Sequence, residues 1–215
     1  MRSTSRTITN PLEAFAISAI CFGWSIYSST QAVSAGFNSG AFTDANLLSI
    51  ILMEIILGGI AFLILYLRRF AVSTLYPAPS LIGIIVGIAI YVAALGVVWV
   101  STAPFVSSLG TQPIDSMVSN ASVSLSTVII MALTNGAYEE VFLLGFLLRG
   151  MRGYGLSVAM GVSLLVRVLY HLYQGPVGAI SVLAFGFVLS LYYVRTGSLF
   201  PAVFAHILAD IIPFL

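Results

Sequence analysis

Two adjacent glutamates, Glu139 and Glu140, lie inside an otherwise apolar run of the sequence. From Val123 to Leu148 the run has no other charge, and it is long enough for a bilayer-spanning helix, which needs about 20 residues. An ionised carboxylate in hydrocarbon costs at least about 2.5–3.5 kcal/mol, so both acids must face a protein interior, a partner or water. Neighbouring helical residues point about 100° apart. We therefore expect one glutamate to do chemistry and the other to anchor the site.

Four further titratable side chains lie in apolar stretches of the second half: Arg167, His171, His206 and Asp210. Arg167 and His171 are four residues apart and share one helix face, and His206 and Asp210 share another. With the glutamates, three helices would each contribute a polar face to one interior. A single buried histidine is more often a hydrogen-bonded core residue, but six polar side chains buried together favour a functional site.

Carboxylates combined with histidines suit three kinds of chemistry. The first is general-base activation of water, with other donors stabilising the oxyanion of a tetrahedral intermediate. The second is a divalent metal site, because histidine and carboxylates are zinc ligands. The third is a proton relay in a transporter. The spacing leaves all three open, but the absence of a GxSxG or His-Glu-x-x-His motif removes serine hydrolases and the zinc proteases that use the latter motif.

The elements that carry these residues are predicted to be membrane helices. The 215-residue chain is 60% hydrophobic and 7% charged, whereas soluble domains have roughly 25% charged residues. We therefore predict an all-α, polytopic transmembrane helix bundle that forms a single integral membrane domain over residues 1–215. The net charge of +1 indicates no nucleic-acid partner, and membrane lipids are the expected surroundings. The single cysteine, Cys21, cannot form an internal disulfide.

The apolar segments predict about seven spans. The first one follows basic residues and precedes small ones, as in a signal peptide, but its apolar part is longer than usual, so we expect a retained helix. The region 101–122 is predicted to be a polar loop. The spans are predicted at about 12–33, 47–67, 81–100, 123–148, 156–173, 177–194 and 199–212.

Arginine positions predict the orientation of the bundle, because loop arginines and lysines accumulate on the cytoplasmic side. The pattern places the N-terminus in the cytoplasm and the C-terminus outside. Arg167 is the exception, because it lies within the fifth predicted span. The other arginines fall at alternate ends of the spans: Arg2, Arg6, Arg68, Arg69, Arg149, Arg152 and Arg195.

Three motifs follow one another within residues 139–210. They are Glu139-Glu140 followed by Gly145-Phe146-Leu147-Leu148, the segment Leu169-Tyr170-His171-Leu172-Tyr173-Gln174-Gly175, and the segment from Pro201 to Asp210. In this order they resemble the CPBP family, the CAAX proteases and bacteriocin-processing enzymes, which are intramembrane endopeptidases related to the Ras-converting CAAX endopeptidases. The first four tenths of the chain show no such resemblance.

The resemblance implies a function and a role for each polar residue. Glu139 and His171 would activate water, Glu140 would help to orient the site, and His206 with Asp210 would stabilise the oxyanion. It also implies glutamate-dependent, metal-independent hydrolysis of membrane-associated or lipidated peptides without a cofactor, although zinc stays open. The expected location is the plasma membrane of a prokaryote. The oligomeric state is left open.

The chain departs from the family pattern at three positions. Leu144 stands where the family usually has arginine, Arg167 replaces a phenylalanine, and Asp210 often corresponds to asparagine. We hypothesise that Arg167 supplies the missing cation to Glu140 or Glu54. An ionised Asp210 would repel an oxyanion, so this side chain must be protonated or must orient His206.

Two alternative functions remain open from the sequence. One is a non-catalytic bacteriocin self-immunity or scaffold protein with the same fold. The other is a proton-coupled transporter built on Glu54, Glu139, His171 and His206. The lack of an apparent inverted repeat weighs against the transporter.

Overall fold

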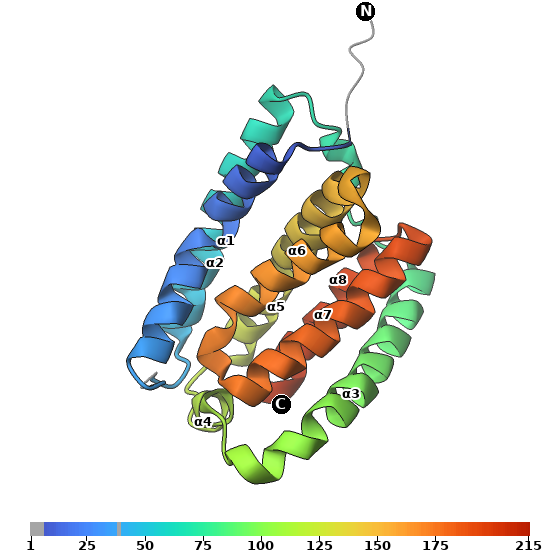
Figure 1. Cartoon of the computed structure of the whole chain (residues 1–215). Coiled ribbons are helices and arrows are strands. Elements are labelled where there is room, and N and C mark those ends of the chain that lie inside the picture. Colours follow the sequence, from blue (N-terminus) through green and yellow to red (C-terminus); the bar gives the residue numbers. More distant parts are fainter. Residues whose placement is uncertain (1–6, 38–39) are drawn as a thin grey trace, which may run out of the picture.

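The long elements of the chain are all helices (Figure 1). The computed structural model describes residues 7–37 and 40–215, and these residues contain isolated β-bridge positions, such as the pair Thr43 and Ser122, but no β-strand. The predicted all-α class is therefore confirmed. The α-helices are α1 (Pro11–Ser34), α2 (Asp44–Leu67), α3 (Leu81–Leu109), α4 (Pro113–Ser119), α5 (Leu125–Glu140), α6 (Leu156–Tyr170), α7 (Pro176–Thr196) and α8 (Phe200–Ile211).

Short 3₁₀-helical and π-helical segments join or extend these helices. The one that matters for the site is η2 (Val141–Leu148), a π-helical segment that continues α5 directly after the two glutamates. The others are the 3₁₀ segments η1 (Val72–Leu75), η3 (Met151–Tyr154), η4 (Leu172–Gln174) and η5 (Ile212–Phe214).

Side-chain caps fix where several of the long helices begin. The hydroxyl of Ser80 accepts a hydrogen bond from the Gly83 backbone N–H at 3.0 Å at the start of α3. The Asn10 side chain accepts one from Glu13 N–H at 2.8 Å at the start of α1. Such caps satisfy amide groups that have no partner within the helix.

The region predicted as a polar loop, residues 101–122, contains more helix than expected. α3 continues nine residues past the predicted end at Val100, and α4 follows it. The Thr102 hydroxyl donates to the Val98 carbonyl at 2.8 Å, so this polar side chain is accommodated within α3. The apolar residues Phe105 and Val106 continue the helix beyond Pro104, which lies inside α3. The predicted loop was therefore wrong over most of its length.

Four helical stretches among the described residues are long and apolar enough to cross a membrane. They are α2, α3, the continuous stretch of α5 and η2, and α7. α6 and α8 have 15 and 12 residues, which corresponds to about 22 and 18 Å, whereas the hydrocarbon core is about 30 Å thick. Seven predicted helical segments are thus present, and the count of seven complete spans stays a prediction.

The arginine-bearing segments meet at one end of the bundle. Arg152 donates to the Val194 carbonyl, next to Arg195, at 2.8 Å. Arg149 donates to the carbonyl of Thr74, which follows the α2 arginines, at 3.4 Å. The ends of α2, η2 and α7 therefore lie together, as alternating spans require. Which side of the membrane this end faces is still a prediction, and Arg2 and Arg6 lie outside the described residues.

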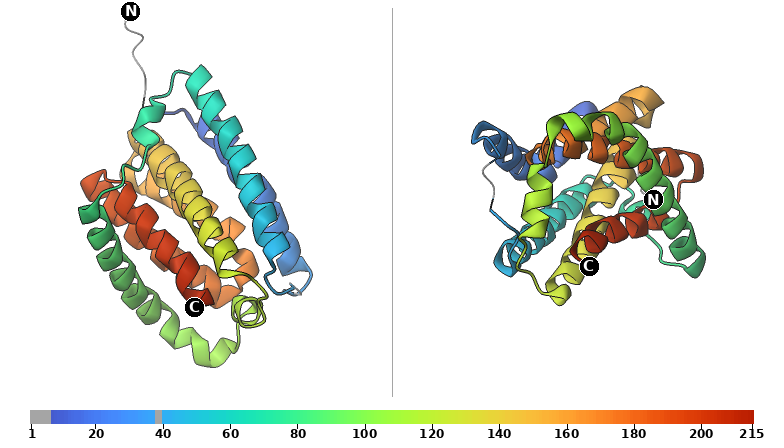
Figure 2. Two further views of the ribbon diagram at one scale, coloured as in Figure 1. Left: turned by 180° about the vertical axis from the view of Figure 1, so that it is seen from behind. Right: turned by 90° about the horizontal axis from the view of Figure 1, so that it is seen from below.

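The stretch formed by α5 and η2 is the central element of the bundle. Within an 18-residue apolar segment of this stretch 61% of the residues are buried, compared with 28% in such segments of α2 and of α3. Every residue of η2 is buried. α1 and α2 lie on one side of it, and Figure 2 shows α8 between α5 and α3. The glutamates thus sit in the protein interior rather than in lipid.

Glycines permit the closest helix contacts, as expected for membrane bundles in which small residues let backbones approach. A Cβ atom on Gly87 of α3 would lie 2.9 Å from the Pro201 carbonyl oxygen and 2.9 Å from Phe204 Cβ on α8. A Cβ on Gly136 of α5 would lie 3.2 Å from the backbone nitrogen of Ile207. α8, which carries His206, is therefore held between two glycine-lined helices.

We predict that Gly87→Ala destabilises the protein. The added methyl group forces α3 away from α8, and overpacking of this kind costs about 1–3 kcal/mol. Gly96→Ala is the matched control on the same helix, because a Cβ there meets nothing within 4 Å. Thermal unfolding in detergent should show a lower midpoint for Gly87→Ala only; equal midpoints would contradict the close α3–α8 contact.

Candidate active site

The predicted polar residues converge from three helices. Glu139 and Glu140 end α5, Arg167 lies on α6 with His171 at its C-terminal cap, and His206 and Asp210 lie on α8. Exposed fractions are 4% for Glu139, 0% for Glu140, 2% for Arg167 and 5% for His206. The structure brings these four side chains into direct contact.

Arg167 is the counter-charge of the glutamate pair. Its Nη2 atom lies 2.7 Å from Glu140 Oε1 and 2.8 Å from Glu140 Oε2, and Nη1 lies 3.5 Å from Glu139 Oε2. Of the two partners hypothesised from the sequence, Arg167 therefore bonds Glu140 rather than Glu54. Gly186 of α7 makes room for it, because a Cβ there would lie 2.6 Å from Arg167 Cδ.

His206 links the three acids of the cluster. Its Nδ1 atom donates to Glu140 Oε1 at 2.6 Å, since a carboxylate can only accept. The other nitrogen, Nε2, lies 3.7 Å from Glu139 Oε2 and 3.6 Å from Asp210 Oδ1. Glu140 thus fixes the orientation of the imidazole ring and turns Nε2 towards Glu139.

Glu139 retains a free oxygen. Its Oε2 atom accepts a short hydrogen bond from the Tyr170 hydroxyl and faces Arg167 and His206. Within the described part of the chain, all its hydrogen bonds end on Oε2. The Oε1 atom is therefore available to accept a proton or a hydrogen bond from a bound molecule.

Tyr170 is a site residue that the sequence did not single out. Its ring stacks on Phe22 of α1, with centroids 4.9 Å apart and planes 11° apart. Phe22 also touches the Tyr138 ring edge-on at 5.7 Å, and the Tyr138 hydroxyl donates to the Cys21 carbonyl at 2.7 Å. α1 thus packs on the tyrosines beside the site. The one sequence signal was that Tyr170 immediately precedes His171.

His171 lies beside the buried cluster rather than in it. Its Nδ1 atom is 2.9 Å from the Arg167 carbonyl oxygen, which makes Nδ1 the donor and leaves Nε2 as the acceptor. Its ring lies 4.3 Å from the Tyr170 ring. No direct contact with Glu139 occurs among the described residues, so the proposed pairing of these two in water activation stays a prediction.

The turn after His171 is held by α1. α6 ends at Tyr170 and the chain continues as η4, whereas the sequence predicted one helix to Tyr173. The backbone N–H of Tyr173 donates to the Ser29 hydroxyl at 2.8 Å. A polar side chain of α1 therefore satisfies a backbone N–H group that is no longer in the regular helix.

Asp210 is engaged on both carboxyl oxygens. Oδ2 accepts a hydrogen bond from the Asn135 side chain at 2.9 Å, and Oδ1 faces His206 Nε2. This arrangement suits the orienting role considered from the sequence. Asn135, on α5 one turn before Glu139, was not predicted as a site residue.

The π-helical geometry of η2 begins directly after Glu140. Such segments are rare and occur often at functional sites. The Leu143 carbonyl in η2 accepts a hydrogen bond from the Ser163 hydroxyl of α6 at 2.9 Å. This bond ties the altered backbone to the helix that carries Arg167.

Three of the site residues have spacing compatible with a metal ion. Ligand atoms of Glu139, Glu140 and His206 lie within 4.8 Å of one another. The Arg167 guanidinium, however, already bonds both oxygens of Glu140, and it places a positive charge beside the space a cation would occupy. The donor set therefore fits an ion-paired acid cluster better than a metal centre.

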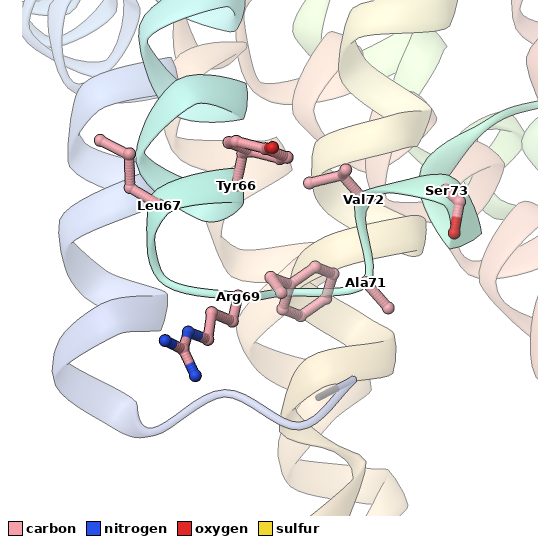
Figure 3. A pocket seen from close by; sticks show the side chains of 7 residues that line it. Tyr66, Leu67, Arg69, Ala71, Val72 and Ser73 are labelled. Atoms are coloured by element: carbon pink, nitrogen blue, oxygen red, sulfur yellow. The ribbon is translucent and has the colours of Figure 1, made fainter. Parts of the chain in front are cut away.

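A surface pocket lies away from this site, in the turn between α2 and η1 (Figure 3). None of the predicted site residues lines it. Its lining residues are Tyr66, Leu67, Arg69, Phe70, Ala71, Val72 and Ser73.

A comparison with known families gave a match, which covers part of the chain. Residues 121–212 match the family model described as type II CAAX prenyl endopeptidase Rce1-like. This confirms the resemblance to the CAAX proteases predicted from the three motifs. Together with the apolar helices, the match supports an integral membrane endopeptidase at the level of the family. A comparison with curated proteins and another with solved structures gave no match.

We predict that Tyr170→Phe lowers kcat for peptide cleavage by about 10- to 100-fold, because a hydrogen bond to a charged group is worth about 1.5–3 kcal/mol. The phenyl ring keeps its stacking on Phe22, so KM should change little, whereas the thermal unfolding midpoint should fall because the same hydrogen bond is present in the free enzyme.

The matched control for this variant is Tyr138→Phe. Tyr138 precedes Glu139 in the sequence, and its hydroxyl donates to the Cys21 carbonyl. The variant therefore removes a tyrosine hydroxyl near the site without removing a hydrogen bond to the acids. A comparable loss of kcat in both variants, or none in Tyr170→Phe, would contradict a specific role of Tyr170 in positioning Glu139.

Proposed function

We propose that the protein is an intramembrane endopeptidase that uses Glu139 to activate water. The observation that carries this proposal is the buried Glu139 carboxylate, which is held on Oε2 by Tyr170 and has a free Oε1. General-base catalysis needs a carboxylate of this kind, fixed in direction and open to water or substrate on one side.

The proposed reaction is a general-base hydrolysis of a peptide bond. Glu139 takes a proton from water, and the water oxygen attacks the carbonyl carbon, whose π electrons move onto the carbonyl oxygen. Glu139 then returns the proton to the amine nitrogen as the C–N bond breaks. The products are a carboxylic acid and an amine, and the carboxylate is regenerated.

In this proposal the surrounding residues orient the reacting groups. His206 in its doubly protonated form presents Nε2–H to the oxyanion, while its Nδ1–H is held by Glu140. Asp210 faces the same Nε2 atom and orients the ring. His171 keeps its Nε2 atom free to accept a hydrogen bond from the water. Arg167 holds Glu140 in place.

We infer that the reaction is metal-independent and that no cofactor takes part. The guanidinium beside the Glu139, Glu140 and His206 cluster supports this inference. The substrates are membrane-associated peptides or lipidated protein C-termini, and the matched family description points to prenylated CAAX sequences. The plasma membrane of a prokaryote is the proposed location.

The test is cleavage of fluorogenic CAAX-box peptides, with and without a farnesyl group, by purified protein in detergent micelles. Glu139→Gln should lower kcat by about 10²- to 10⁴-fold, since this is the usual contribution of general-base catalysis. Glu13→Gln is the control, because Glu13 lies near Arg68 at the other end of α1, and it should retain activity. A strong chelator should leave the rate unchanged.

Other results of the cleavage assay would contradict the proposal or favour the metal-dependent mechanism or the transporter. Cleavage that survives Glu139→Gln would contradict the proposal, and loss of cleavage with a chelator, restored by zinc, would favour the metal mechanism. Absence of cleavage by the wild type, combined with pH-gradient-dependent solute uptake into vesicles, would favour the transporter.

A further inference from the structure

Glu54 is a fourth buried acid beside the site, and it comes from α2, outside the matched residues 121–212. Its side chain is 5% exposed. α2 packs on α5 one turn further along, where a Cβ on Gly58 would lie 3.3 Å from the Tyr138 ring. Glu54 interacts electrostatically with Glu139, Asp210 and His206. Its carboxyl group therefore faces the interior of the cluster and not the lipid.

Glu54 differs from the other acids of the cluster in its hydrogen bonding. Glu140 bonds Arg167 and His206, Glu139 bonds Tyr170, and Asp210 bonds Asn135. Within the part of the chain that the structure describes, the buried Oε2 atom of Glu54 has no hydrogen-bond partner. Buried polar atoms are nearly always hydrogen-bonded, because leaving one without a partner is costly. This oxygen thus indicates a bound species that supplies a donor.

The charged neighbours of Glu54 are poorly placed to supply that donor. An ionised Glu139 or Asp210 can only accept hydrogen bonds, and the two nitrogens of His206 face Glu140, Glu139 and Asp210. A molecule that enters the site can supply this donor. An extended peptide carries a main-chain N–H at every residue other than proline.

We propose that Glu54 accepts a hydrogen bond from a main-chain N–H of the peptide substrate, close to the scissile bond. α2, which packs beside α5, then forms one wall of the substrate site. This inference rests on the proposed peptidase function and adds a substrate-binding residue to it. The ligand class is a peptide in extended conformation.

The first test compares Glu54→Gln with Glu54→Leu on the fluorogenic farnesylated peptide. The glutamine keeps a carbonyl acceptor in the same place, so KM should stay within about threefold of the wild-type value. The leucine has no acceptor, and KM should rise at least about tenfold with a smaller change in kcat, as expected when a ground-state contact is lost. The unfolding midpoint of Glu54→Leu should equal or exceed the wild-type midpoint, because no intraprotein bond of Oε2 is lost.

The second test removes substrate donors one at a time by N-methylation of each residue flanking the scissile bond. At one position the methyl group should raise KM for the wild type but add nothing for Glu54→Leu. Such non-additivity identifies the N–H group that pairs with the carboxyl.

Two results would overturn the inference alone: a wild-type KM for Glu54→Leu, or additive penalties at every methylated position, which would mean that water satisfies Oε2. In both cases Glu139→Gln would still be inactive. If the wild type cleaves none of the peptides, the proposed function fails, and the substrate role of Glu54 fails with it.

Discussion

The structure depends on neutralising two adjacent carboxylates inside an apolar helix. Arg167 supplies the neutralising positive charge through two short contacts to Glu140 and a longer one to Glu139. Breaking a buried ion pair by removing one partner typically costs about 3–5 kcal/mol. Much of the local packing accommodates the guanidinium: Gly186 leaves space for it, and the Ser163 bond to Leu143 ties α6 to η2.

The same ion pair gives the two glutamates different surroundings. Glu140 is fully committed to Arg167 and His206 and serves as the anchor. Glu139 has one committed oxygen and one free oxygen, which suits it to chemistry. The two neighbouring glutamates thus differ in their hydrogen bonding, and the different roles expected for them stay a prediction.

The N-terminal helices complete a site whose family motifs all lie in the second half of the chain. Phe22 of α1 stacks on Tyr170, Ser29 holds the turn after His171, and Glu54 of α2 faces the acids. The sequence singles out Glu54, as a charge in an apolar run, but not Phe22 or Ser29, because packing partners distant in the chain cannot be inferred from periodicity alone. The contacts of these residues with the site are therefore found only in the folded bundle.

The sequence was sufficient for the helical segments and for the convergence of charged residues, because charges in apolar runs must find partners. The hypothesis that Arg167 replaces a missing cation came from the departures from the family pattern at Leu144 and Arg167. The sequence missed Tyr170 and Asn135, which carry no charge, and it missed the π-helical geometry of η2 and the end of α6 at Tyr170. The length of α3 was underestimated because Pro104 and nearby hydroxyl residues resembled a loop.

The central claim is that Arg167 and Glu140 form one unit that sustains the fold and the reactive position of Glu139. The most direct measurement is a double-mutant cycle of Arg167→Met, Glu140→Met and the double variant, with unfolding free energy and peptide cleavage measured on each. We predict that each single variant loses about 3–5 kcal/mol, and that the double variant regains most of this stability but stays inactive. Additive losses of stability, or an active and stable Arg167→Met, would contradict the account.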